Sequence, residues 1–178
     1  MDNVIHTETL PAEIAGVDAM FRLSLVADNS AGAPWKECDT MGSVSDWETR
    51  GKAPGELLLC EDRGSKRFYD FAGAMKANRQ YYANGADCEK AVRADFEYLR
   101  RWCNDDWQYV GVVVELLDDE GDPIDGADAS LWCVESDAED YIRKELFGEL
   151  VSDIEANLPG LRDTLRKKHA AILAKIGG

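Results

Sequence analysis

Hydrophobic and polar positions alternate along residues 19–28, where apolar side chains stand at every second place from Phe21 to Leu25. A period of two residues predicts a strand with one face buried and the other exposed. Two short apolar runs bounded by turn residues, 56–60 and 66–69, predict two more strands.

A long segment between the first two predicted strands, residues 29–55, is rich in Gly, Pro, Ser and Asp. Trp35 and Trp47 interrupt it. Loops of this length are usually functional or held in place by large side chains. We expect the two tryptophans to hold the loop against the protein, and a ligand-binding platform is the alternative.

The hydrophobic period changes to three and four residues in the next part of the chain. It predicts a helix over 71–82, which Asn84-Gly85 ends, and a second helix over 86–103. The β-branched run within 107–117 then predicts the strongest strand of the sequence.

A hairpin and two helices are predicted for the rest of the chain. Residues 118–126 carry the Gly and Pro of a turn, and 129–135 alternate as a returning strand. Ser136 and Glu139 have the spacing of a capping box, which predicts the start of a helix that runs to about residue 157. A last, basic helix is predicted over 161–176, after a Pro-Gly break.

This order of elements predicts an α+β fold, with a mostly antiparallel sheet of about four to five strands and helices packed on one face. No linker divides the sequence, so we expect a single domain over residues 1–178. Its expected parts are strands with a long loop (19–71), a helical pair (71–103), an acidic β-hairpin (104–136) and two C-terminal helices (137–176).

Charge is distributed unevenly along the chain. The protein has 20 Lys and Arg against 35 Asp and Glu, a net charge of −15. Residues 104–157 contain 17 acidic and two basic residues, so this segment carries the entire net charge. Such a surface disfavours direct binding to nucleic acid or to an anionic membrane, because both need a positive face.

The predicted acidic helix arranges part of this charge in a row. Glu145, Glu149 and Asp153 are four residues apart, so they share one helix face at a rise of about 6 Å. That spacing approaches the spacing of phosphates on a DNA strand. Together with the hairpin they form a candidate partner-binding surface, whose residues are Asp118, Asp119, Glu120, Asp122, Asp125, Asp128, Glu139, Glu145, Glu149 and Asp153.

Two other interpretations of these carboxylates stay open. They are typical of a solvated face that keeps a protein soluble, and the basic last helix could neutralise them. An EF-hand starting at Asp118 is excluded, because its sixth position is not Gly and its twelfth, Ala129, is not Glu.

Other candidate chemistry is sparse. The five cysteines are separated by 22, 28, 15 and 30 residues without a C-x-x-C pair, so we expect reduced thiols and neither a metal site nor a cofactor. The two histidines, His6 and His169, stand near opposite ends of the chain, and no catalytic motif predicts an enzyme. No apolar run approaches the ~20 residues of a membrane span, and the N-terminus lacks the pattern of a signal peptide.

Several strings of the sequence resemble a set of uncharacterised proteins encoded by tailed bacteriophages and prophages. These strings are Val44–Trp47, Pro54–Leu57, Arg63–Ala72, Trp102–Val112 and Ser130–Trp132 followed by Glu135-Ser136. The resemblance covers most of residues 34–157, although the family often has Gly after the tryptophan where this chain has Cys133. It implies no activity, but it implies a phage gene product that acts in the bacterial cytoplasm.

Small acidic phage proteins include anti-restriction and anti-CRISPR inhibitors, several of which imitate DNA. By this analogy we expect a protein whose acidic surface occupies the basic surface of a bacterial nucleic-acid-binding protein or complex. Trp107, Trp132 and Tyr141 are the candidate aromatic anchors, because aromatic residues dominate binding hot spots. The alternative is a phage accessory or assembly protein that acts through protein–protein contacts without mimicry, with a homodimer through the last helix.

Overall fold

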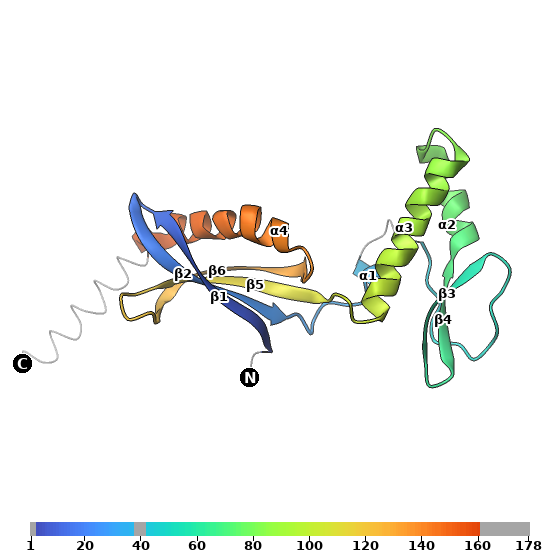
Figure 1. The fold of residues 1–178 in the computed structure, drawn as a ribbon, viewed down its shortest axis with the longest axis horizontal. Coiled ribbons are helices and arrows are strands. Elements are labelled where there is room, and N and C mark those ends of the chain that lie inside the picture. The colour runs from blue at the N-terminus through green and yellow to red at the C-terminus, as the bar shows by residue number, and fades with distance from the viewer. Residues whose placement is uncertain (1–2, 38–41, 161–178) are drawn as a thin grey trace, which may run out of the picture. The chain divides into compact units, whose positions relative to one another are not determined.

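The computed structural model describes residues 3–37 and 42–160. Within them the fold is α+β, with a four-stranded antiparallel sheet, a separate two-stranded sheet and helices (Figure 1). The expected fold class is therefore confirmed.

The chain forms two compact units, although the sequence predicts a single domain. Unit 1 comprises the chain up to Asp28 and from Tyr109 onward, and unit 2 is Asn29–Gln108. Buried hydrophobic side chains form one cluster in each unit. The two units differ from the expected single domain because the strands that precede and follow Asn29–Gln108 pair directly with each other. At the junction, the Asp28 amide donates to the Tyr109 carbonyl at 3.0 Å. The segment between them can then build a core of its own.

The sheet of unit 1 has the strand order β1-β2-β5-β6. The strands are β1 (Val4–Ile14), β2 (Val17–Ala27), β5 (Tyr109–Leu117) and β6 (Pro123–Glu135). The sequence-based prediction does not include β1. The strand is mostly exposed, and its apolar residues alternate only near its end, at Leu10, Ala12 and Ile14. Its position follows from a tight turn, in which Ala15 and Gly16 both have positive φ and return the chain to β2.

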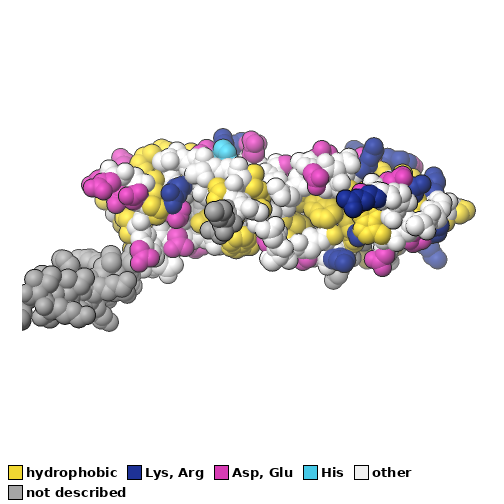
Figure 2. Space-filling model, turned by 90° about the horizontal axis from the view of Figure 1, so that it is seen from below, with side chains coloured by type: hydrophobic (Ala, Val, Ile, Leu, Met, Phe, Trp, Pro, Cys, Tyr) yellow, Lys and Arg dark blue, Asp and Glu magenta, His cyan; other side chains and the backbone are white. Residues whose placement is uncertain are grey.

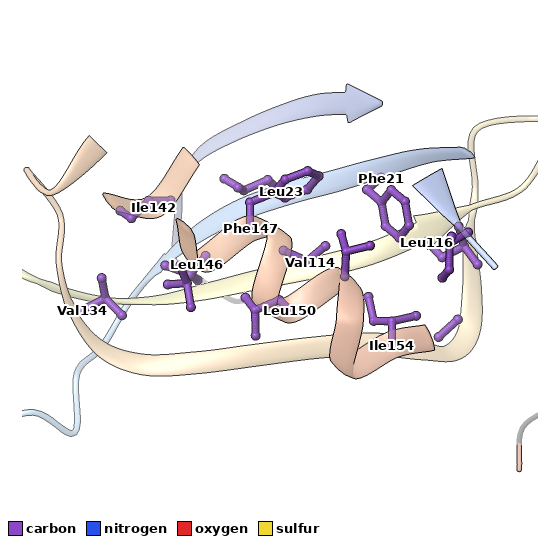
Figure 3. Close-up of a cluster of buried hydrophobic side chains, with 14 of the residues drawn as sticks. Phe21, Leu23, Val114, Leu116, Val134, Ile142, Leu146, Phe147, Leu150 and Ile154 are labelled. Atoms are coloured by element: carbon purple, nitrogen blue, oxygen red, sulfur yellow. The ribbon is translucent and has the colours of Figure 1, made fainter. Parts of the chain in front are cut away.

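One helix covers one face of this sheet (Figure 1). It begins as α4 (Glu139–Tyr141), passes through a π-helical turn, η2 (Ile142–Leu146), and continues as an α-helix over 147–160. Its apolar side chains enter the space above β2 and β5 (Figure 3). Phe147 meets Phe21 edge to face, with ring centroids 6.1 Å apart.

The start of this helix differs from the prediction. The N-cap is Ala138, which makes no side-chain cap hydrogen bond, so the predicted capping box at Ser136 is wrong. The chain first makes a turn, in which the Ala138 amide donates to the Glu135 carbonyl at 3.1 Å, and the helix begins only after it. The predicted last helix, 161–176, lies outside the described residues.

Unit 2 pairs a β-hairpin with helices. Its elements are α1 (Pro34–Glu37), β3 (Glu56–Asp62), β4 (Ser65–Asp70), α2 (Phe71–Asn78), the 3-10 helix η1 (Arg79–Tyr81) and α3 (Gly85–Cys103). The Asp70 carboxylate accepts the Gly73 amide at 2.8 Å and caps α2, and the side chain of Asn84 caps α3 in the same way. The predicted strands are thus present, but β3 and β4 form a sheet of their own.

Part of the long loop pairs with this hairpin. Ser45 exchanges two hydrogen bonds with the Phe68 backbone, through its amide (2.8 Å) and its hydroxyl (3.0 Å). Glu48 and Lys66 form an isolated bridge further along. The loop therefore lies along β4 as an additional, irregular strand. No helix among the described residues is long and apolar enough to cross a membrane.

Candidate functional site

The net charge of the protein divides by unit. The described residues of unit 1 include 19 Asp and Glu against three Lys and Arg, a net charge of −16. The described residues of unit 2 include 13 acidic and 12 basic residues, a net charge of −1. Figure 2 shows Asp and Glu side chains at one end of unit 1, whereas Lys and Arg are more frequent on unit 2. The negative charge is thus a property of one folded unit.

The three Lys and Arg among the described residues of unit 1 form ion pairs with carboxylates outside the candidate surface. The pairs are Arg22–Glu115 (2.8 Å), Arg143–Glu8 (3.1 Å) and Lys144–Asp140 (2.9 Å). The described part of the candidate surface therefore keeps an excess of negative charge, although Arg22 also attracts Asp122 at longer range.

The hairpin turn places its carboxylates by local hydrogen bonds. One carboxylate oxygen of Asp118 accepts the amides of Glu120 and Asp122, each at 2.9 Å. Gly121 has a φ of +87°, which a residue with a side chain rarely adopts, so the turn can close. Because Asp118 satisfies the turn's amides, the neighbouring carboxylates are free to point into solvent, and all of them are exposed.

The helical row is also exposed. Glu145, Glu149 and Asp153 each immediately precede a buried leucine or isoleucine of the core stripe, so the row runs beside that stripe. Glu139 is the exposed first residue of α4, where its negative charge interacts favourably with the helix dipole.

The candidate surface is not confined to one face of the sheet. Asp128 pairs across the strands with Glu115, and directly paired residues project from the same face. Glu115 alternates with the core residues Val114 and Leu116, so this face is the one opposite the helix. The carboxylates therefore occupy the exposed helix, the hairpin turn and the uncovered face, all within unit 1.

Two of the three candidate aromatic anchors are accessible. The side chain of Trp132 is 48% exposed and that of Tyr141 is 39% exposed. The Trp132 indole lies on Gly111, where an added Cβ would be only 2.6 Å from a ring carbon. Glycine at this place lets the indole lie flat on β5.

Trp107 is not an anchor, because it is 2% exposed and belongs to unit 2. Its Nε1 donates to the Tyr98 carbonyl at 3.2 Å, and its ring lies 4.6 Å from the Tyr98 ring. A fully buried indole stabilises the core of unit 2 and offers no surface to a partner.

Cys133 occupies a bulge in β6 and has a φ of +62°. Two residues of β6, Trp132 and Cys133, stand opposite the single residue Gly111 of β5, and the Cys133 amide donates to the Asp28 carboxylate at 3.2 Å. The left-handed conformation favours glycine, so a residue with a Cβ is strained at this position.

Sequence reasoning missed an aromatic site in unit 2. Trp35, expected to hold the long loop, contacts Trp102 edge to face at 5.2 Å. Trp47 remains 46% exposed, and the Arg67 guanidinium lies over both loop tryptophans. The only signal in the sequence was the pair of tryptophans in a polar loop, since Trp102 and Arg67 come from distant segments.

No protein-family model, curated protein or solved structure matches the chain. Among residues 3–37 and 42–160, no three His, Cys, Asp or Glu side chains are grouped so that they could hold a metal ion.

Proposed function

We propose that this chain is a phage-encoded acidic binding protein that inhibits a nucleic-acid-binding defence system of the bacterial host, of the restriction or CRISPR type. It acts in the host cytoplasm by occupying the basic surface that otherwise binds nucleic acid. The observation that carries the proposal is the net charge of −16 on the described residues of unit 1, whose three cations form ion pairs outside the candidate surface.

Electrostatics favours a partner-facing role for this charge. Dense like charges destabilise a folded state through self-repulsion, and solubility alone needs fewer of them with both signs interspersed. A surface of this kind attracts a basic groove, speeds association and makes binding strongly dependent on salt. The distribution over helix, turn and sheet face suits a groove that encloses its nucleic acid, because such a groove contacts more than one side of its ligand.

The accessible aromatic residues complete the proposed interface. Trp132 and Tyr141 are both exposed and both belong to unit 1. Buried aromatic contacts supply most of the affinity in many interfaces, whereas rim charges mainly set the association rate. We therefore expect the carboxylates to set the specificity and the association rate, and Trp132 and Tyr141 to supply the affinity that remains at high salt.

A competition assay tests the proposal. Fluorescent duplex DNA is bound to a purified restriction enzyme, and fluorescent target DNA is bound to a purified, guide-loaded CRISPR effector. Displacement of the DNA by the full chain is followed by fluorescence anisotropy at low and high salt. The expected result is displacement that weakens steeply with salt. The triple variant Glu145→Lys, Glu149→Lys and Asp153→Lys should lose displacement without losing thermal stability.

A matched control carries the same change in charge on unit 2. Glu89→Lys, Glu97→Lys and Asp106→Lys alter three exposed carboxylates there, and this variant should displace DNA like the wild type. Equal activity of the two triple variants would refute the role of the helical row. If no effector is displaced and light scattering detects a dimer that is lost on deletion of residues 161–178, the accessory or assembly role replaces the inhibitor proposal.

A further inference from the structure

Unit 2 contains a pocket of about 380 Å³ that the acidic surface does not involve. Its walls include Trp35, Trp47 and Trp102, with Arg67, Cys60 and Cys103 between them. Small-ligand sites are typically concave, aromatic-walled and about 300–1,000 Å³ in volume, with a few polar groups that orient the ligand. The size and the lining of this pocket match that description.

Four segments of unit 2 build the pocket. The short helix α1 supplies Trp35, the β3–β4 hairpin supplies Cys60 and Arg67, and the last turn of α3 supplies Trp102 and Cys103. The pairing of Ser45 and Glu48 with β4 places the intervening Trp47 beside Arg67. Main-chain hydrogen bonds therefore hold the loop that closes the pocket.

Arg67 is the unusual residue of this site. Its guanidinium carbon lies 5.1 Å from the Trp35 ring centroid and 4.7 Å from that of Trp47. Its Nε is buried and has no hydrogen-bond partner, and no carboxylate of the described residues forms an ion pair with the side chain. Stacking on tryptophan offsets part of the cost of burying a cation, but the guanidinium keeps an unused capacity to bind an anion.

The formal charges of the pocket lining cancel, but its two carboxylates are paired. Glu61 and Asp62 each have a cationic neighbour outside the lining, Lys66 at 3.8 Å and Arg63 at 4.0 Å. Lys36 lines the same pocket and pairs with none of the described carboxylates. Among the described residues, Lys36 and Arg67 are therefore the lining cations that remain for an anion.

The Cys103 thiol adds no negative charge to the pocket. Burial is the main cause that raises the pKa of the Cys103 thiol to about 12, and a hydrogen bond with Cys60 raises it further. Cys103 is consequently neutral at physiological pH. Its neutrality leaves Arg67 as the dominant charge among the tryptophans.

We propose that this pocket binds a small planar aromatic anion of the size of a nucleoside 5′-monophosphate. Arg67 and Lys36 bind the anionic group, since a guanidinium fork matches the geometry of phosphate or carboxylate oxygens. The aromatic ring stacks on the exposed indole of Trp47, as bases stack on aromatic side chains elsewhere. The proposal concerns unit 2 and does not depend on the inhibitor function assigned to unit 1.

Calorimetric titration of the full chain tests the ligand class. The four purine and pyrimidine nucleoside monophosphates, their parent nucleosides, inorganic phosphate and indole-3-carboxylate are compared. At least one aromatic anion should bind at one site per chain, and the parent nucleoside and inorganic phosphate should each bind at least about tenfold more weakly. Preference between the monophosphates and the carboxylate identifies the anionic group.

Variants test the residues. Arg67→Gln should weaken binding by about 10- to 100-fold, because a charge-assisted hydrogen bond is lost. Lys36→Gln, on an exposed side chain, should weaken it several-fold with an unchanged melting temperature, which separates ligand contact from folding. Lys76→Gln is the matched control, since Lys76 is an exposed lysine of unit 2 that is not among the pocket residues.

Two results would overturn the proposal. The first is the absence of saturable binding by every aromatic anion tested with the folded wild-type chain. The second is an equal loss of affinity in Lys76→Gln and Lys36→Gln, which would mean that binding follows general charge and not the pocket.

Discussion

Cys133→Gly is expected to stabilise the protein, against the usual effect of glycine in a strand. Cys133 has a φ of +62° in the bulge of β6, and its side chain is exposed. Replacement by glycine therefore relieves backbone strain without leaving a cavity in the core.

The magnitude follows from two opposing contributions. A residue with a Cβ costs about 1–2 kcal/mol in the left-handed region, and glycine removes this cost. Glycine also increases the conformational entropy of the unfolded chain, which costs about 0.4–1 kcal/mol. The net gain is about 0.5–1 kcal/mol, which corresponds to a rise in melting temperature of about 1–4 °C for a chain of this size.

Thermal unfolding of the wild type and three variants measures the effect. Cys133→Ala removes the thiol but keeps the strain, so its melting temperature should stay close to that of the wild type. Ser130→Gly introduces glycine at an exposed position of the same strand that has no positive φ, and it should destabilise by about 0.5–1 kcal/mol. If Cys133→Gly melts at or below the temperature of Cys133→Ala, the strain argument is refuted.

Three further outcomes are expected. Leu150→Ala, at a 3% exposed core position, should lower the free energy of unfolding by about 2–5 kcal/mol in urea titrations followed by circular dichroism. Asp70→Ala removes the cap that accepts the Gly73 amide and should cost about 0.5–2 kcal/mol, with faster hydrogen exchange in the first turn of α2. Hydrogen bonds from Arg50, and to a lesser extent one from the Ala53 amide, lower the pKa of Glu56 from 4.5 to about 2. The stabilisation by ionised Glu56 is complete above pH 4.5 and is lost as the pH falls towards about 2. Opening of the loop that contains Arg50 and Ala53, measured by amide hydrogen exchange, should therefore increase over this range in the wild type and change less in Glu56→Gln.

Much of the secondary structure follows from local periodicity. The alternation from Phe21 to Leu25 predicted β2, and the three- and four-residue spacing over 86–103 predicted α3. Both patterns record which face of an element is buried, and that information lies within a few residues of sequence. The edge strand β1 was missed although Leu10, Ala12 and Ile14 stand at every second place, because this alternation is short and most of the strand is exposed.

The candidate sites depended on the sequence to different degrees. Exposure of the acidic row at Glu145, Glu149 and Asp153 is the expected result of a helix whose other face is apolar. The burial of Trp107 was not predictable, since the local sequence around a tryptophan beside a strand does not show whether its indole is buried or exposed. The pocket around Arg67 was also beyond prediction, because its tryptophans come from separate segments.

By itself the sequence determined the α+β class, most of the elements and the concentration of negative charge after residue 104, because these are properties of composition and short-range spacing. Only the tertiary structure decided that β2 pairs with β5, that the intervening segment forms a second core, and that Arg67 lies over Trp35 and Trp47 without an ion pair to any carboxylate of residues 3–37 and 42–160. Strand pairing and side-chain burial join residues far apart in the chain, and no local pattern specifies which distant residues will meet.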